Sequence, residues 1–159
     1  MAAGQRITAD RLNGITPIFQ SWTPSWTTSS GAATPSIGNG TYDCEYAQVG
    51  NLVVCRFEVV FGTTTNFGGG GASDNWRFSA PVTAAAITTY AGTAELTQTN
   101  SLRVYSRARL TTTTTFEFEV SSGQPDGNAV GNTGLTDSVT PWTWASGNAI
   151  RAFMSYEAA

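Results

Sequence analysis

The chain has 159 residues, a formal net charge of −3 and no His, and all eight of its basic residues are Arg. Without His it cannot contain a Ser-His-Asp triad or a His-liganded zinc, and without Lys it cannot contain a P-loop or form a Schiff base. The acidic balance disfavours nucleic acid and anionic membranes as partners, and no apolar run reaches the roughly 20 residues of a membrane span. We therefore expect a soluble, non-enzymatic protein that holds no metal or cofactor and binds neither nucleic acid nor membrane.

Residues 1–18 carry the only helix-like signal of the chain. Thr8 can cap a short helix, and Gly14 or Pro17 would end it. Such a helix is too short to be stable alone in water, so it either packs on its own domain or serves as an arm for a partner. We adopt the second interpretation, in which residues 1–18 dock on a partner and residues 19–159 form the folded domain. The docking residues are then Arg6, Ile7, Arg11, Leu12, Ile15 and Ile18.

Two tryptophans, Trp22 and Trp26, flank Pro24 in the segment that follows. Large aromatic side chains cover protein cores and also dominate contact surfaces, so two roles are open. The tryptophans cover one end of the core, which is the commoner outcome, or they form an exposed aromatic surface.

Residues 40–61 predict an antiparallel hairpin, because apolar residues alternate with polar ones on both sides of a turn at residues 48–51. In this register Cys44 lies directly opposite Cys55. The face that both halves share is expected to line the core. Its members are Tyr42, Cys44, Tyr46, Val53, Cys55, Phe57, Val59 and Phe61.

The two cysteines of this hairpin are expected to be buried neighbours, with Cβ atoms within about 5 Å of each other. A protein made in a cytoplasm starts with thiols, so we expect Cys44 and Cys55 to be reduced. On the opposite face the same register pairs Asp43 with Arg56 across the strands.

Residues 101–120 predict a second hairpin, in which alternate positions of the first half form a stripe of arginines. A turn near residues 110–112 would place Arg103 opposite Glu119 on the neighbouring strand. A nucleic-acid site would need unpaired arginines in a basic domain. We therefore interpret the stripe as a charge-paired solvent face or a subunit contact.

Further strand patterns occur at residues 76–80, more weakly at 82–99, and at 149–156, while 62–74 and 121–134 are typical of Gly-rich or turn-rich loops. Short strands separated by frequent turn signals, with almost no helix, are characteristic of all-β domains. The predicted fold is an antiparallel β-sandwich or jelly roll of about eight strands, preceded by the short N-terminal helical arm.

Five segments resemble a known group of proteins. They are AGQRITADRLN near the start, WTPSW, PSIGNGTY, FSAPV, and PWTWASGNAIRAFMSYEAA at the end. In these segments the chain is similar to small structural proteins and C-terminal domains of tailed phages of actinobacteria, which include minor tail, fibre and minor capsid components. Members usually carry Gly-Asp after the tryptophan of the last motif, where this chain has Gly147-Asn148, a departure confined to a turn.

The resemblance implies a β-rich virion component, often trimeric, that is assembled in the cytoplasm of the host bacterium. We expect a capsid decoration or head-fibre protein, which forms a homotrimer and binds the major capsid protein. A minor tail protein, bound to a tail protein of the same virion, is the alternative.

Two functions of other classes stay open. A host-surface module could bind glycans by stacking exposed tryptophans on sugar rings. The candidates are Trp22, Trp26, Trp76, Trp142 and Trp144. A glycosidase would need a pair of carboxylates, but no spacing in the sequence singles out a pair. The candidates are Glu45, Asp74 and Asp126.

Overall fold

The computed structural model describes residues 18–99, 102–120 and 134–159, and every regular element in these residues is a β-strand. The helix predicted in the N-terminal arm lies outside the described residues. The strands are β1 (Gln20–Ser21), β2 (Trp26–Thr28), β3 (Thr41–Val49), β4 (Leu52–Val60), β5 (Trp76–Ser79), β6 (Gly92–Gln98), β7 (Leu102–Leu110), β8 (Thr115–Val120), β9 (Gly134–Leu135) and β10 (Ala149–Glu157).

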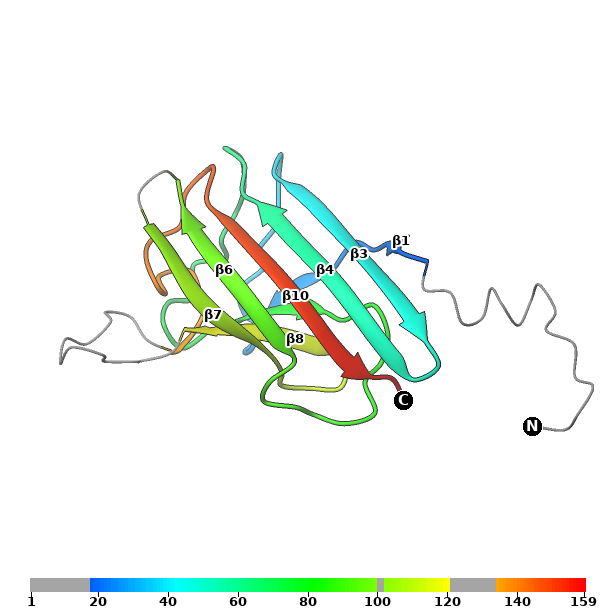
Figure 1. The fold of residues 1–159 in the computed structure, drawn as a ribbon. Coiled ribbons are helices and arrows are strands. Elements are labelled where there is room, and N and C mark those ends of the chain that lie inside the picture. Colours follow the sequence, from blue (N-terminus) through cyan, green and yellow to red (C-terminus); the bar gives the residue numbers. More distant parts are fainter. Residues whose placement is uncertain (1–17, 100–101, 121–133) are drawn as a thin grey trace, which may run out of the picture.

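All the strands belong to one antiparallel sheet, in the order β1-β3-β4-β10-β6-β7-β8-β5-β2, with β9 beside β8 (Figure 1). The sheet stays continuous through its bend because residues 102–108 of β7 pair with β6, while residues 106–110 pair with β8. The all-β antiparallel class is therefore confirmed. The predicted sandwich of about eight strands is corrected to one curled sheet of ten strands, a half-barrel.

A short piece of chain ties the two edges of the sheet together. β1 pairs with β3 at one edge, β2 pairs with β5 at the other, and residues 22–25 connect β1 to β2. The backbone N–H of Trp22 donates a hydrogen bond to the Cys44 carbonyl (2.9 Å), and the backbone N–H of Ser79 donates to the Ser25 carbonyl (2.9 Å). This link holds the curled sheet together across its open side.

The β3–β4 hairpin is confirmed, but its predicted register is wrong by two residues. Val49 pairs with Leu52, so only Gly50 and Asn51 form the loop. The favoured two-residue loops need positive φ, which Gly50 supplies at 58°. A shift of two residues keeps every side chain on its predicted face, because side chains alternate with a period of two.

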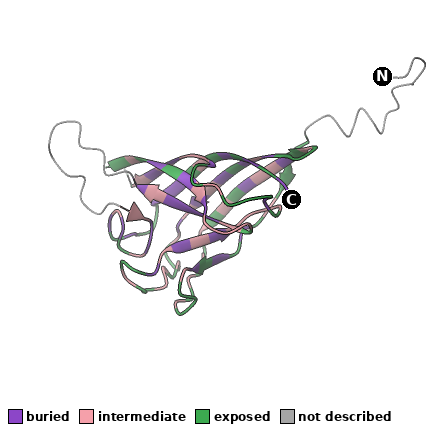
Figure 2. Ribbon diagram, turned by 90° about the horizontal axis from the view of Figure 1, so that it is seen from below, coloured by how far each residue is buried: buried purple, intermediate pink, exposed green. Residues whose placement is uncertain are grey.

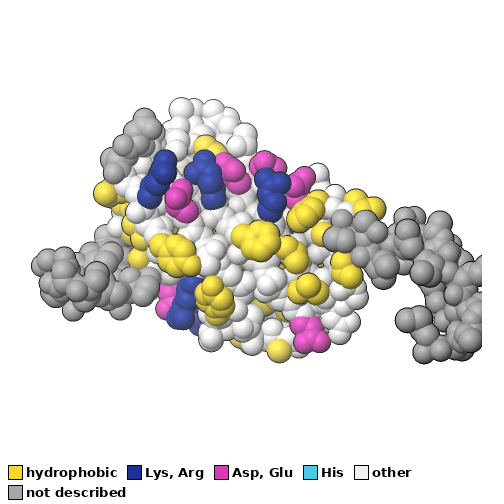
Figure 3. All heavy atoms as spheres, in the orientation of Figure 1, with side chains coloured by type: hydrophobic (Ala, Val, Ile, Leu, Met, Phe, Trp, Pro, Cys, Tyr) yellow, Lys and Arg dark blue, Asp and Glu magenta, His cyan; other side chains and the backbone are white. Residues whose placement is uncertain are grey.

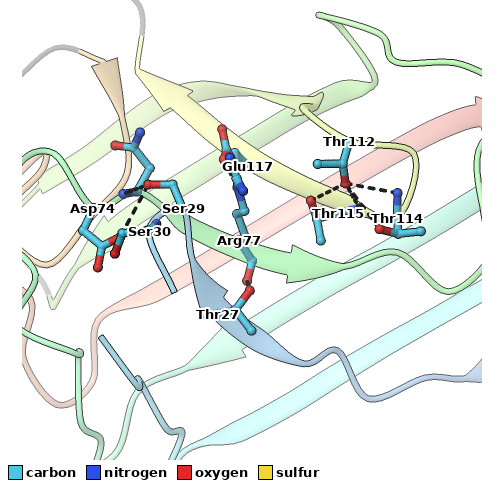
Figure 4. A network of polar contacts seen from close by, with 10 residues as sticks. Thr27, Ser29, Ser30, Asp74, Arg77, Thr112, Thr114, Thr115 and Glu117 are labelled. Carbon is cyan, nitrogen blue, oxygen red and sulfur yellow. Dashed lines mark hydrogen bonds and ion pairs between the residues drawn. The ribbon is translucent and has the colours of Figure 1, made fainter. Parts of the chain in front are cut away.

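The β7–β8 hairpin is also confirmed, with a register shifted by four residues from the prediction. Arg107 lies opposite Glu119, where the prediction placed Arg103. The turn comes later in the chain than expected, and the Thr112 hydroxyl accepts a hydrogen bond from the Thr115 N–H (2.9 Å) (Figure 4). Because this threonine run contains neither Gly nor Pro, the sequence did not mark where the turn lies.

Aromatic rings dominate the core that the curled sheet encloses. The ring of Phe57 lies 5.1 Å from that of Phe78 and 5.4 Å from those of Phe116 and Phe118. Figure 2 shows buried and exposed positions alternating along the strands, as the period of two requires. Burial of each large apolar side chain contributes about 1.5–3 kcal/mol.

The last strand of the sequence lies in the middle of the sheet, because β10 pairs with β4 on one side and β6 on the other. The predicted strand at residues 149–156 is thus confirmed. Its inner face buries Ile150, Met154 and Tyr156, whereas its outer face leaves the Phe153 side chain exposed.

Candidate binding face

Only one residue of the predicted docking arm lies within the described residues. Ile18 is 62% exposed, and a single residue, Phe19, separates it from the start of β1. The others, Arg6, Ile7, Arg11, Leu12 and Ile15, lie outside the described residues. The docking arm therefore stays a prediction.

The tryptophans lie in the core rather than on the surface. Trp26 is buried, stacks on Phe78 at 5.7 Å and meets Trp76 edge-on at 4.8 Å. Trp22 is half-buried, with its ring 6.1 Å from that of Phe57. The remaining two tryptophans are buried as well. The alternative of an exposed tryptophan surface is corrected, because these rings are needed to fill the core.

The two cysteines are buried and are not bonded to each other. Cys44 lies opposite Phe57, and Cys55 lies opposite Tyr46, so the predicted direct opposition of the cysteines is wrong. They are diagonal neighbours on one face, farther apart than a directly opposed pair. Burial raises the pKa of both thiols to about 12, which keeps them protonated and unreactive at neutral pH.

Two buried carboxylates, Glu117 and Asp137, accept hydrogen bonds from an arginine side chain and from backbone N–H groups. Glu117 is 1% exposed and accepts a hydrogen bond from Arg77 Nε at 2.7 Å (Figure 4). Asp137 Oδ1 accepts hydrogen bonds from the backbone N–H groups of Val139 (2.7 Å) and Thr140 (2.8 Å). Both carboxylates are therefore committed to neighbouring parts of the chain.

The two described candidates for a glycosidase pair have separate partners. Glu45 forms an ion pair with Arg56 at 2.9 Å, which also corrects the predicted pairing of Arg56 with an aspartate. Asp74 accepts hydrogen bonds from the Ser30 N–H (2.8 Å) and the Ser29 hydroxyl (3.4 Å). The hydrogen bond from the Ser30 N–H, helped by neighbouring hydroxyls, lowers the pKa of Asp74. The third candidate, Asp126, lies outside the described residues.

Within the part of the chain that the structure describes, no three His, Cys, Asp or Glu side chains gather closely enough to hold a metal ion. The described residues also include no helix that is long and apolar enough to cross a membrane.

The outward side of β3, β4, β10, β6 and β7, which we call the outer face, carries most of the described charges. Antiparallel pairing aligns its side chains in rows across the strands. One row, from β3 to β7, consists of Asp43, Glu58, Arg151, Glu95 and Tyr105. The adjacent row consists of Glu45, Arg56, Phe153, Thr93 and Arg107. Figure 3 shows charged side chains in a band across this face, with hydrophobic side chains beside the band.

Cross-strand ion pairs hold the arginines of the outer face in place. Arg151 binds Glu58 at 2.9 Å and Arg56 binds Glu45 at 2.9 Å. By contrast, Asp43 makes no hydrogen bond or ion pair with any described residue. The outer face therefore combines fixed guanidinium donors with a carboxylate that is free to accept hydrogen bonds from solvent or ligand.

Two arginines of the β7 stripe are charge-paired with Glu119, the acid that the prediction had assigned to Arg103; Arg103 itself lies opposite Thr97 and has no ion pair with a described residue. Arg107 and Arg109 both bind Glu119, at 2.7 and 2.9 Å. Partial burial acts to raise the pKa of Glu119, but the hydrogen bonds and charges of the two arginines outweigh it and lower the pKa.

Two shallow hollows lie on the outer face. The first, of about 320 Å³, is lined by both Tyr105 and Phe153 together with charged residues of the two rows. The second, of about 260 Å³, is lined by Phe153 and Tyr90. Phe153 and Thr93 border both hollows, so the two adjoin. Tyr105, Phe153 and Tyr90, which we call the aromatic trio, are 70%, 56% and 61% exposed.

Part of this face could be found in the sequence. The alternation in residues 101–120 placed Tyr105 among the arginines, and that in residues 149–156 placed Arg151 and Phe153 on the second face of the last strand. Nothing in the sequence indicated that these two strands lie on either side of β6, because such pairing is non-local.

Comparison with known proteins adds no relative: no family model, curated protein or solved structure matches this chain.

Proposed function

We propose that the protein is a non-enzymatic structural component of a tailed-phage virion, a decoration or head-fibre protein on the capsid surface, with a minor tail protein as the alternative. The observation that carries the proposal is the place of the resembling segments in the fold. WTPSW includes the link between the two edges of the sheet, FSAPV ends β5, and the last segment supplies two core tryptophans and the central strand β10. The resemblance thus rests on residues that build the sheet, which suits a protein whose role is shape.

The state of the described carboxylates supports a non-enzymatic role. Glycoside hydrolysis needs two carboxyl groups that flank one bond, with one of them holding a proton at working pH. Glu45 is bound to an arginine, and hydrogen bonds lower the pKa of Asp74, which favours its ionised form. Asp74 is therefore unsuited to serve as the acid of such a pair.

In this proposal residues 1–18 dock on a capsid or tail protein, and residues 19–159 form the outward-facing body of a homotrimer. Ile18 is exposed beside the edge strand β1, so the chain that precedes it joins the domain at a sheet edge. An arm joined there can bind a particle without disturbing the core, since its attachment point contributes no buried side chain.

The test is incorporation into particles. Full-length protein and a variant lacking residues 2–16 are produced during infection, and purified virions are analysed by quantitative mass spectrometry. We expect the full-length chain in the virions and the truncated chain only in the unassembled fraction, with equal melting temperatures for the two purified proteins. Virions that lack the full-length chain would overturn the proposal, and truncated protein in virions would place docking on the β-domain.

The stoichiometry is tested separately by sedimentation equilibrium. We expect a mass three times that of the chain for the isolated protein or, where association needs the particle, three copies per binding site in a cryo-EM map of the virion. A stable dimer would contradict the proposed trimer.

A further inference from the structure

We propose that the outer face is a binding site for a neutral oligosaccharide, with the aromatic trio as its stacking platforms. This inference does not depend on the virion proposal, because it rests on the surface of the isolated domain. It also differs from the glycan site that the sequence suggested, since none of the tryptophans takes part.

The first argument is the exposure of the three rings. Tyr105, Phe153 and Tyr90 keep more than half of their surface in contact with solvent, although every other ring of the described residues except Phe19 is buried or half-buried. Large apolar rings exposed together mark binding surfaces. Flat rings of this kind can stack on the apolar faces of sugars, and the tyrosine hydroxyl can also form hydrogen bonds.

The second argument is the spacing of the rings. Tyr105 lies on β7 and Phe153 on β10, in adjacent rows with β6 between them. Their backbones are separated by two strand spacings, together about 10 Å, and by two residues along the strands, which gives about 12 Å. This distance is comparable to the length of a disaccharide. The hollows of about 320 and 260 Å³ adjoin at Phe153. The rings of the aromatic trio and the two hollows thus form an extended surface, which fits a chain of several sugars better than a single compact ligand.

The third argument is the polar lining of the first hollow. Three carboxylates, Asp43, Glu58 and Glu95, stand against two guanidiniums, Arg56 and Arg151, which leaves a net charge of −1. That balance disfavours anionic polymers such as phosphate-rich or uronic-acid chains.

Two of these carboxylates, Asp43 and Glu95, are also available to a ligand. Asp43 has no hydrogen bond to a described residue, and the only described donor to Glu95 is the Thr97 hydroxyl, which donates to its Oε1 (3.1 Å). Ionised carboxylates are pure acceptors, and the hydroxyl groups of a neutral sugar are the donors they need. The guanidiniums, held by Glu45 and Glu58, can donate to sugar oxygens without having to be ordered first.

The test uses full-length protein and an array of immobilised neutral oligosaccharides, followed by calorimetry with the best ligand. Tyr105→Ala and Phe153→Ala should each weaken binding by about three- to tenfold, the value of one aromatic contact, whereas Tyr105→Trp should retain it. Leu102→Ala is the matched control, because Leu102 is as exposed as Phe153 but lines neither hollow. Melting curves establish that all variants are folded.

Three outcomes would overturn the inference. They are no binding of any neutral oligosaccharide at millimolar concentration, unchanged binding by the Tyr105→Ala/Phe153→Ala double variant, and binding restricted to anionic polymers or basic peptides. Sedimentation of the double variant tests whether a second copy of the chain binds this face instead. If the substitutions dissociate an oligomer, the outer face is a contact between copies of the chain and the inference fails.

Discussion

The inner and outer faces of β10 alternate along the same nine residues, yet their side chains do different things. Inward, Ile150 and Met154 are almost fully buried and belong to the same hydrophobic core as the aromatic rings. Outward, Arg151 binds the neighbouring strand and Phe153 stays exposed between two hollows. The inner face accounts for most of the stability, and the outer face holds exposed side chains that contribute less to it. The predictions below test this division, and they also compare buried with exposed charges and thiols.

The largest effect is expected from a cavity in the inner face. Phe57→Ala should reduce the free energy of unfolding by about 3–5 kcal/mol, because Phe57 contacts three buried rings and the space left behind cannot collapse fully. Phe153→Ala on the outer face should change it by less than about 0.5 kcal/mol. Both values come from chemical denaturation, and similar losses in the two variants would contradict the division of roles between the faces.

A smaller loss is expected at Arg77, the partner of a buried acid on the outward side of β5 and β8. Arg77→Met should cost about 2–3 kcal/mol, since it leaves the Glu117 carboxylate buried without its ion-pair partner; the partial exposure of Arg77 keeps the loss below that of a fully buried pair. The matched control is Arg56→Met, which breaks an exposed pair and should cost at most about 1 kcal/mol.

The Arg77 prediction has a second check, in which the buried charge itself is removed. Adding Glu117→Gln to Arg77→Met should recover part of the loss. Equal losses in Arg77→Met and Arg56→Met would show that burial of Glu117 adds nothing to the value of the pair.

Acid should destabilise the protein through two carboxylates whose pKa is lowered in the folded state, Asp74 and Glu119. A lowered folded pKa means that the contribution to stability is complete above the unfolded pKa, about 4, and is lost as the pH falls through the folded pKa. The free energy of unfolding should therefore decline below about pH 4. In the Asp74→Asn/Glu119→Gln double variant that decline should be shallower, and an unchanged slope would argue against the assignment.

The last prediction concerns the thiols of the inner face, and it is measured by their reactivity towards a thiol reagent rather than by a change in stability. At pH 8 folded protein should not react with a thiol reagent, while denaturant should release both Cys44 and Cys55, because burial raises the pKa of each to about 12. Because these pKa values are raised, the protonated thiols contribute to the free energy of unfolding. That contribution is complete below the unfolded thiol pKa, about 8.5, and is lost as the pH rises towards 12. A Ser155→Cys variant supplies the outer-face control and should react at once. Prompt reaction of the native cysteines would place them outside the core.

The alternation of apolar and polar residues predicted which face of each long strand is buried, and this part of the fold could be taken from the sequence. Registers could not. Gly50 fixes a two-residue loop, and a threonine hydroxyl fixes the β7–β8 turn, so local turn geometry moved both hairpins by an even number of residues without changing their faces.

The pairing of distant strands was the second limit of the sequence. Whether β8 closes a second layer or continues the same sheet depends on which residues of β7 it pairs with, and strand patterns do not encode that choice. The same limit applies to the outer face, whose rings at Tyr105 and Phe153 come together only through β6. The sequence also suggested tryptophans for glycan contact, but the core required their large apolar rings.

The central position of β10 has a consequence for how the protein is made. Among the described strands of the sheet β10 is synthesised last, and until it emerges β4 and β6 each present a row of unpaired backbone N–H and C=O groups. The nascent chain can form its hairpins during translation, but it cannot complete the sheet until β10 has left the ribosome. A chain interrupted before Ala149 would therefore retain two open strand edges that can pair with other chains, so the product of premature termination is an aggregate rather than a smaller folded domain.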